Sequence, residues 1–159
     1  MKLSKAPEFT LPDQNGVSRS LTDYLGRWVV LYFYPRDDSL NCVREACRFR
    51  DEYQIIGQFG NAEIIAINKG SVSSHHKFAT KHHLNFLVLS DAGHKVTSRY
   101  GVWRGNSGKL IDMAFGTRRN TYLIDPAGNI VKRYLGVGSK NHVEEVITDL
   151  QAMQAAAVD

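Results

Sequence analysis

The sequence contains little cysteine and no long apolar run. Its 159 residues include only two cysteines, Cys42 and Cys47, which are too few for a disulfide-stapled scaffold. A zinc site is also disfavoured, because zinc commonly takes about four ligands, usually with tighter cysteine or histidine pairing. No apolar stretch approaches the ~20 residues that a membrane-spanning helix needs, so we expect no membrane association.

The N-terminus lacks the pattern of a secretory signal. Residues 1–8 include two lysines and no apolar segment of the kind that such signals carry. We therefore expect a cytoplasmic protein. In that compartment stable disulfides are rare, and a close pair of cysteines is more often catalytic or redox-sensing.

Charge of one sign is not concentrated anywhere in the chain. The 20 lysines and arginines exceed the 16 acidic residues by four, and acids interrupt the basic stretches, as in residues 44–45 and 50–52. A nucleic-acid-binding protein typically gathers basic residues on one stripe with aromatic partners. The charge pattern therefore indicates no nucleic-acid partner.

Strand and helix signals alternate along the chain. The β-branched and aromatic run at 28–34 predicts a central strand buried on both faces, and Asn15-Gly16 predicts a small hairpin. The other predicted elements are helices at 41–58, 71–83, 91–100 and from about 141, strands at 62–67 and 86–89, and a hairpin joining 121–125 to 129–134. This order predicts one domain over residues 1–159, with a three-layer α/β thioredoxin-like fold, a mixed sheet and an N-terminal β-hairpin.

The two cysteines lie where chemistry is favoured. Cys42 stands where a helix is expected to begin, and the helix dipole and free backbone N–H groups favour a thiolate there. Cys47 lies one and a half turns further on, close enough to trap an oxidised form of the first thiol. Two buried structural cysteines would give the same spacing, so the surrounding sequence has to decide.

Several stretches resemble the peroxiredoxins of the Q type, also called bacterioferritin comigratory protein. They are residues 6–13, 30–35, 45–51 and 121–130. The signature P-x-x-x-[T/S]-x-x-C is present as Pro35, Ser39 and Cys42, and Arg119 precedes the Thr-Tyr strand as in that family. The likeness runs from about residue 4 to residue 150.

The resemblance implies a role for each of these residues. Cys42 would be the peroxidatic thiol and Cys47 the resolving thiol of the same chain. Arg119 and Ser39 would hold the thiolate and the peroxide, and Pro35 would shield the thiolate from bulk water. The implied partners are a peroxide substrate and a thioredoxin or glutaredoxin-like reductant. No metal or organic cofactor is implied, and resolution within one chain implies a monomer.

The chemistry agrees with that assignment. Peroxide reduction is an in-line attack of sulfur on the O–O bond, and the thiolate is the competent nucleophile. An arginine supplies fixed N–H donors to the oxygens as negative charge moves onto the leaving group. Taken singly, Arg119 reads as a surface residue, Ser39 as a helix cap and Pro35 as a strand end. Their joint arrangement around Cys42 favours catalysis.

The chain departs from the family pattern in two places. Leu40, Asn41 and Val43 stand where Pro, Gly and Thr are common around the peroxidatic cysteine. Residues 68–70 read Asn-Lys-Gly, where a Ser-x-Asp turn is usual. The first departure suggests a different flexibility of the loop and a different rate.

Four histidines form two pairs, His75-His76 and His82-His83, on one predicted helix. Seven residues make two turns, so the pairs share a face but lie ~10 Å apart along the axis. One zinc ion with Zn–N bonds near ~2 Å does not span that distance. We predict a solvated helix face.

Two other functions stay open from the residues alone. A thioredoxin-like disulfide oxidoreductase would use C-x-x-C and commonly a proline before Thr121, whereas this chain has C-x4-C and Asn120. A non-enzymatic redox sensor that binds a partner when oxidised is the second alternative. Peroxide consumption with a thioredoxin system separates the three functions.

Overall fold

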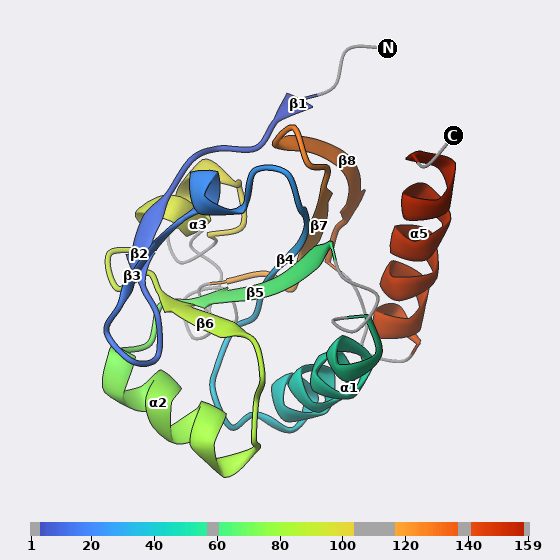
Figure 1. Cartoon of the computed structure of the whole chain (residues 1–159). Coiled ribbons are helices and arrows are strands. Elements are labelled where there is room, and N and C mark those ends of the chain that lie inside the picture. The colour runs from blue at the N-terminus through green and yellow to red at the C-terminus, as the bar shows by residue number, and fades with distance from the viewer. Residues whose placement is uncertain (1–3, 57–60, 104–116, 137–140, 158–159) are drawn as a thin grey trace.

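The computed structural model describes residues 4–56, 61–103, 117–136 and 141–157. Its centre is a six-stranded mixed sheet in the order β1-β8-β7-β4-β5-β6 (Figure 1). The strands are β1 (Ser4–Lys5), β4 (Trp28–Phe33), β5 (Ala62–Asn68), β6 (Leu87–Ser90), β7 (Thr121–Ile124) and β8 (Asn129–Tyr134). β2 (Thr10–Pro12) and β3 (Ser18–Ser20) form a separate hairpin. The helices are α1 (Leu40–Ile56), α2 (Val72–Lys81), α3 (Lys95–Arg99), α5 (His142–Ala157) and the 3-10 helix η1 (Leu21–Tyr24).

Strand β4 contributes side chains to two hydrophobic cores, one on each face of the sheet. It runs parallel to β5 and antiparallel to β7, and all six of its residues are buried. Successive side chains of a strand point to opposite faces of the sheet. Trp28, Val30 and Tyr32 accordingly pack with α1, α2 and α5 on one face, and the alternate residues pack with α3 and the N-terminal segment on the other. The run is apolar throughout because helices or loops cover β4 on both faces of the sheet.

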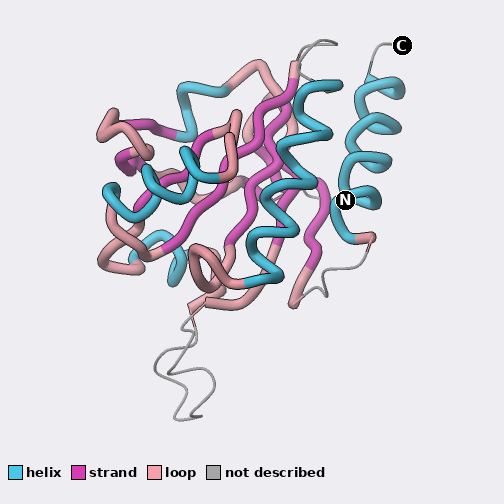
Figure 2. The backbone as a smooth tube through the Cα atoms, turned by 90° about the horizontal axis from the view of Figure 1, so that it is seen from below, coloured by secondary structure: helices cyan, strands magenta, loops and turns pink. Residues whose placement is uncertain are grey.

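The helices form the outer layers. Figure 2 shows α1 and α5 side by side along one face of the sheet, and α3 lies on the opposite side, near the β2–β3 hairpin (Figure 1). Tyr32 of β4 stacks on Phe49 of α1, with ring centroids 4.6 Å apart. This contact fixes α1 against the strand that precedes it in the sequence.

The predicted fold class is confirmed, and the elements differ from expectation mainly at their ends. The helix expected at 91–100 is only α3, because Asp91 caps it. The Asp91 carboxylate accepts hydrogen bonds from the backbone N–H and the hydroxyl of Thr97, at 2.8 and 2.7 Å. His94 adopts a left-handed φ of 46°, so residues 91–94 form a turn.

The other predicted elements differ less from those in the structure. Sequence reasoning missed β1 and η1, which are short and carry no periodic pattern. The expected end of the first long helix, at residues 57–58, lies outside the described residues. The single domain over 1–159 stays a prediction. In the part of the chain that the structure describes, no helix is long and apolar enough to cross a membrane.

Candidate active site

Cys42 lies in the first turn of α1, just beyond the end of β4. Its side chain is buried, with 1% of the residue exposed. Its backbone N–H donates to Ser39 Oγ at 3.3 Å, and the backbone N–H of Val43 donates to the Ser39 carbonyl at 2.9 Å. Ser39 therefore caps the start of the helix, and the thiol sits at the helix's positive end.

Arg119 reaches Cys42 because of the sheet topology. β7 is antiparallel to β4, and its first residue, Thr121, pairs with Tyr32 near the end of β4. The backbone N–H of Phe33 donates to the Asn120 carbonyl at 2.8 Å, which extends this pairing. Arg119 consequently stands beside the point where the chain leaves β4 for α1.

The Arg119 guanidinium binds two acidic groups. Nη2 donates to Cys42 Sγ at 3.2 Å, and Nη1 donates to Glu45 Oε1 at 2.8 Å. The Arg119 side chain is 14% exposed. Burial works to lower its pKa, but Glu45 and Cys42 outweigh that and raise the pKa above its ordinary value. The guanidinium is therefore a fixed cation between a carboxyl and a sulfur.

Glu45 is a functional residue that sequence reasoning missed. It lies three residues after Cys42 on α1, so both side chains share one face of the helix. Burial raises its pKa to about 7, even though Arg119 acts in the opposite direction. The buried carboxyl is therefore partly protonated near neutral pH, beside a guanidinium that also binds the Cys42 sulfur.

His142 closes the far side of this cluster, and it was also missed. It is the first residue of α5 and is buried. Its Nε2 lies 2.8 Å from Thr121 Oγ1 and 3.8 Å from Glu45 Oε2. Burial first, and then the charge of Arg119, lower its pKa to about 4, so the ring is neutral at neutral pH. A charged imidazole would compete with Arg119 for the anions.

Comparison with known proteins identifies the family. Residues 3–133 match the model of the AhpC/TSA family. The chain is 39% identical over 151 residues to peroxiredoxin Bcp of Bacillus subtilis, covering 94% of each protein. It is 41% identical over 145 residues to a putative peroxiredoxin bcp of Coxiella burnetii, covering 90% of this chain and 93% of that protein. The chain belongs to the peroxiredoxins of the Bcp and Q type.

Solved structures agree with that assignment. The peroxidoxin BcpB of Mycobacterium tuberculosis superposes with a TM-score of 0.83 at 32% identity, covering 96% of this chain and 97% of that one. The bacterioferritin comigratory protein of Xanthomonas campestris gives 0.82 at 26% identity, with 91% of each chain covered. That protein is described with alkyl peroxide reduction activity and a trapped intermediate. The peroxiredoxin described here is a thiol-dependent peroxidase with the thioredoxin fold of its relatives, and enzymes of this family are recycled by thioredoxin-type reductants.

The second cysteine of the peroxiredoxin lies on the same unbroken helix as the first. Cys47 is half-buried, both cysteines are free thiols, and Arg50 Nη1 donates to Cys47 Sγ at 3.6 Å. Five residues of α-helix separate the two Cα atoms by roughly 8.6 Å, whereas a disulfide needs about 7 Å or less. The two sulfurs therefore cannot bond while α1 is intact.

Pro35 and Ser39 lie in the connection from β4 to α1, and the first departure from the family pattern lies in the first turn of α1. Pro35 is half-buried, two residues after the end of β4. Leu40 and Asn41 are exposed in the first helical turn, and Val43 is half-buried against the core. The structure thus brings Cys42, Ser39 and Arg119 into hydrogen-bonding contact, with Pro35 on the same loop and Cys47 further along the helix.

The prediction of a solvated histidine face is wrong for His75. That residue is completely buried, and the His82 side chain is only 17% exposed, whereas His76 and His83 are exposed. The physical reason is helical spacing: His75, Phe78 and the C-cap residue His82 are three and four residues apart, so they lie on one side of α2, where Phe78 belongs to the hydrophobic core and contacts the His82 ring. Within the described ranges, no three histidine, cysteine or acidic side chains gather as metal ligands would.

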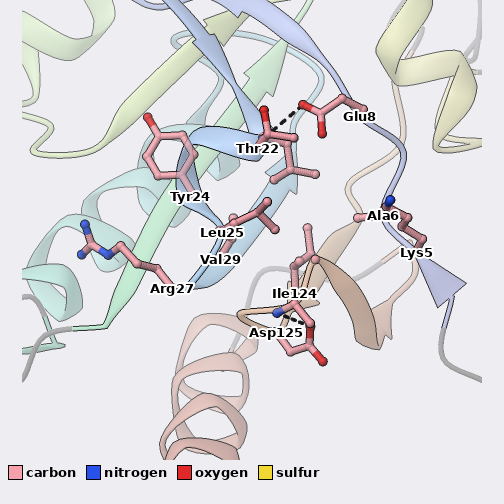
Figure 3. Close-up of a pocket in the computed structure, with 13 residues that line it drawn as sticks. Lys5, Ala6, Glu8, Thr22, Tyr24, Leu25, Arg27, Val29, Ile124 and Asp125 are labelled. Atoms are coloured by element: carbon pink, nitrogen blue, oxygen red, sulfur yellow. Dashed lines mark hydrogen bonds between the residues drawn. The ribbon is translucent and has the colours of Figure 1, made fainter.

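The peroxiredoxin also has a cavity of about 290 Å³ at the other end of β4. Leu25, Val29 and Ile124 line it, with charged residues such as Arg27 and Asp125 at its edge (Figure 3). Val29 is near the start of β4, roughly 13 Å of strand from Phe33 at its end, and Cys42 lies beyond that end in α1. This cavity is no part of the thiol site.

Proposed function

We propose that Cys42 is the residue that reduces the peroxide and that Cys47 resolves the product within the same chain. One observation carries the proposal: the Arg119 guanidinium bonds the Cys42 sulfur at 3.2 Å, at the N-terminal end of α1. The thiolate is the nucleophile in this reaction, and a cation and a helix N-terminus both interact favourably with negative charge.

The first step oxidises Cys42. The thiolate attacks one oxygen of the peroxide and the O–O bond breaks. That oxygen stays on sulfur as sulfenic acid, and the other leaves as water or an alcohol after taking up a proton. Arg119 donors stabilise the charge on the leaving oxygen. Ser39 holds the backbone of Cys42 in place, and Pro35 shields the thiolate from bulk water.

The second step forms the Cys42–Cys47 disulfide. The Cys47 thiolate attacks the sulfenic sulfur, the S–O bond breaks, and water leaves. A dithiol protein of the thioredoxin or glutaredoxin type then supplies two electrons and regenerates both thiols. Because the cycle depends on continuous reduction, we place the enzyme in the cytoplasm.

Two serine variants test the two roles separately. Cys42→Ser abolishes peroxide consumption in an assay coupled to thioredoxin and its reductase, and retention of more than a few per cent of turnover would remove Cys42 from this role.

Cys47→Ser consumes about one equivalent of peroxide and then stops. Mass spectrometry of that variant shows Cys42 as sulfenic acid or a higher oxide; unchanged thioredoxin-linked turnover contradicts Cys47 as the resolving thiol. Replacing thioredoxin by glutaredoxin in the wild-type assay identifies the reductant class.

A further inference from the structure

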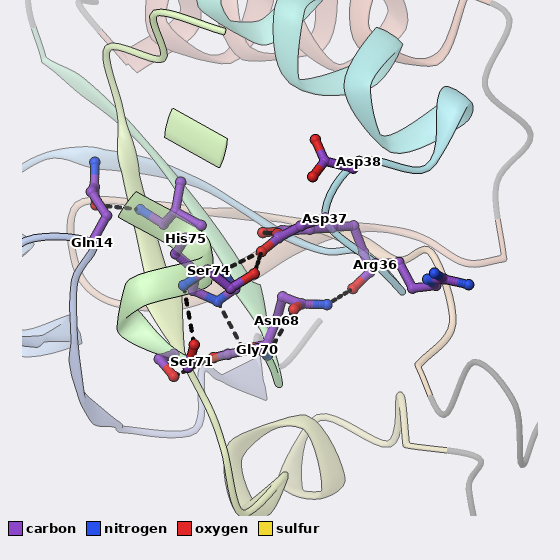
Figure 4. A network of polar contacts seen from close by, with 12 residues as sticks. Gln14, Arg36, Asp37, Asp38, Asn68, Gly70, Ser71, Ser74 and His75 are labelled. Atoms are coloured by element: carbon purple, nitrogen blue, oxygen red, sulfur yellow. Dashed lines mark hydrogen bonds and ion pairs between the residues drawn. The ribbon is translucent and has the colours of Figure 1, made fainter. Parts of the chain in front are cut away.

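Asp37 lies in the loop that leads from β4 into α1, and it binds Tyr34 of that loop and two residues of α2. Its Oδ1 accepts a hydrogen bond from the Tyr34 hydroxyl at 2.6 Å. Its Oδ2 accepts from the Ser74 hydroxyl at 2.6 Å and contacts His75 Nδ1 at 3.0 Å. These contacts tie the loop to the first turn of α2 (Figure 4). The Asp37 side chain is only 9% exposed, so water competes little for its oxygens.

His75 carries the connection to the end of β5. Its Nε2 lies 3.3 Å from the Asn68 carbonyl, and the Asn68 amide donates to the Tyr34 carbonyl at 2.7 Å. Tyr34, Asp37, Asn68, Ser74 and His75 therefore form a closed ring of contacts, which we call the Asp37 clasp. The departure at residues 68–70 is part of it, because the Asn68 side chain is one of its links.

The clasp is tightly packed. A Cβ atom at Gly70 would lie 2.9 Å from both Asn68 Oδ1 and His75 Cε1, closer than side chains pack. The Gly70 backbone N–H donates to Asn68 Oδ1 at 2.8 Å. Glycine is thus required at this position by the close approach of the backbone to the His75 ring.

The clasp is also charge-assisted. Burial works to raise the pKa of Asp37, but the hydrogen bond and charge of His75, with the bonds of Ser74 and Tyr34, lower the pKa below its ordinary value. Both ring nitrogens of His75 face acceptors, a carboxylate oxygen and a carbonyl oxygen. Hydrogen bonds to an ionised carboxylate are stronger than those between neutral groups.

The clasp ends two residues before the cap of the reactive helix. Only Asp38, with a left-handed φ of 63°, separates Asp37 from Ser39, which accepts the backbone N–H of Cys42. A displacement of Asp37 therefore moves Ser39, and with it the Cys42 sulfur relative to Arg119. From this geometry we propose that His75 and Asp37 are positioning residues for the peroxide step: they hold the loop at 35–39 and the first turn of α1 in the shape in which Cys42 reacts.

This proposal rests on Cys42 as the peroxidatic residue, and it separates the two chemical steps. Oxidation of Cys42 needs the fixed loop, because the sulfur, Arg119 and the peroxide have to be aligned. Disulfide formation needs the first turn of α1 to leave that shape. Loss of the clasp therefore slows the first step and does not slow the second. A residue that only stabilised the fold would change neither rate at a temperature where the protein is folded.

The test compares His75→Gln with His76→Gln. His76 is the adjacent residue, is exposed, and contacts the Gln14 carbonyl at 3.2 Å outside the clasp. Stopped-flow mixing of the reduced proteins with hydrogen peroxide measures Cys42 oxidation, and the following phase measures disulfide formation. For His75→Gln we expect oxidation at least about tenfold slower, the effect of one lost charged hydrogen bond, with disulfide formation as fast as in wild type or faster. His76→Gln retains both rates.

Any of the following outcomes overturns the proposal. Oxidation within twofold of wild type in His75→Gln shows that the clasp does not position Cys42, and equal slowing of both steps shows general damage. If His75→Gln does not fold, Ser74→Ala removes one clasp bond at a helical position that accepts alanine, and oxidation within twofold of wild type in that variant has the same meaning. Cys42→Ser, run beside them, reports on the proposed function itself, independently of the clasp.

Discussion

At the scale of single residues, the site is a buried cation shared by two acids. Arg119 binds Cys42 and Glu45 at 3.2 and 2.8 Å, and His142 stands neutral behind Glu45. Burial raises the pKa of Glu45 to about 7, although Arg119 works to lower it. The carboxyl is therefore partly protonated near neutral pH, which reduces its demand on the Arg119 charge.

Arg119→Ala slows peroxide reduction without unfolding the protein. Loss of one preorganised charge-stabilising donor typically costs ~10²–10³ in rate. Stopped-flow oxidation of Cys42 measures the change, and circular dichroism checks the fold. Arg118→Ala is the matched control, because Arg118 is the adjacent arginine and is exposed. Equal rates in Arg119→Ala and wild type would make Arg119 a bystander.

Glu45 and His142 give the stability of the fold opposite pH dependences. The folded-state pKa of Glu45 is raised from 4.5 to about 7, so its contribution to stability is present below pH 4.5 and is lost as the pH rises through 7. The folded-state pKa of His142 is lowered from 6.5 to about 4, so its contribution is present above pH 6.5 and is lost as the pH falls through 4. The two slopes offset each other between about pH 4.5 and 6.5.

Glu45→Gln removes one of these slopes. The side chain at position 45 of the variant is neutral at every pH. The free energy of unfolding of the variant therefore rises relative to that of wild type between pH 4.5 and 8. The pKa shift of Glu45 corresponds to a rise on the order of 3 kcal/mol. Urea unfolding across this pH range measures the difference. Glu52→Gln removes a carboxylate from the same helix outside the site and serves as the control. Parallel pH curves for Glu45→Gln and wild type would contradict the buried, protonatable carboxyl.

At the scale of elements, α1 has two incompatible tasks. As an intact helix it presents Cys42 at its N-terminal end, in contact with Arg119. The same intact helix keeps Cys42 and Cys47 too far apart to bond. In the proposed cycle the helix therefore has to open once per turnover, and its first turns are the part that carries both thiols.

We predict that residues 41–48 unwind when the Cys42–Cys47 disulfide forms. The half-buried Val43 and the buried Phe49 lose packing in the opened state, which gives a reductant an apolar surface. Amide hydrogen exchange of the reduced and oxidised protein measures the loss of protection, and residues 143–150 of α5 are the internal reference. Equal protection of residues 41–48 in both states, with the disulfide established by mass, would refute the unwinding.

At the scale of the whole molecule, the site lies where the sheet changes direction. β4 has the parallel β5 on one side and the antiparallel β7 on the other, so the end of one strand and the beginning of another meet at the start of α1. This arrangement brings together residues 77 positions apart, Cys42 and Arg119.

We expect the enzyme to be a monomer in both redox states. Both thiols lie on one helix, so resolution needs no partner chain. Sedimentation of the reduced and peroxide-treated protein gives the mass of one chain, 17.9 kDa, in each case. A band of twice that mass on a non-reducing gel, lost in Cys47→Ser, would show resolution between chains instead.

The sequence by itself determined the fold class and most elements, and it singled out Cys42 as the proposed reactive cysteine. These depend on patterns that are local in the chain: the apolar run that becomes β4, the helical spacing that becomes α1, and the signature from Pro35 to Cys42. Arg119 was predicted only through the family resemblance, because nothing in its own neighbourhood distinguishes it from Arg118. Glu45 lies three residues after Cys42, and that spacing was the available signal for it.

Only the tertiary structure decided which polar side chains are buried together. His142 reaches Thr121 and Glu45 through the packing of α5 on α1, and His75 reaches Asp37 from a position 38 residues away. Periodicity states which face a residue occupies, but it does not state what that face meets. The partner is set by strand order, register and the path of the loops. A buried histidine and a solvated one therefore look alike until the chain is folded.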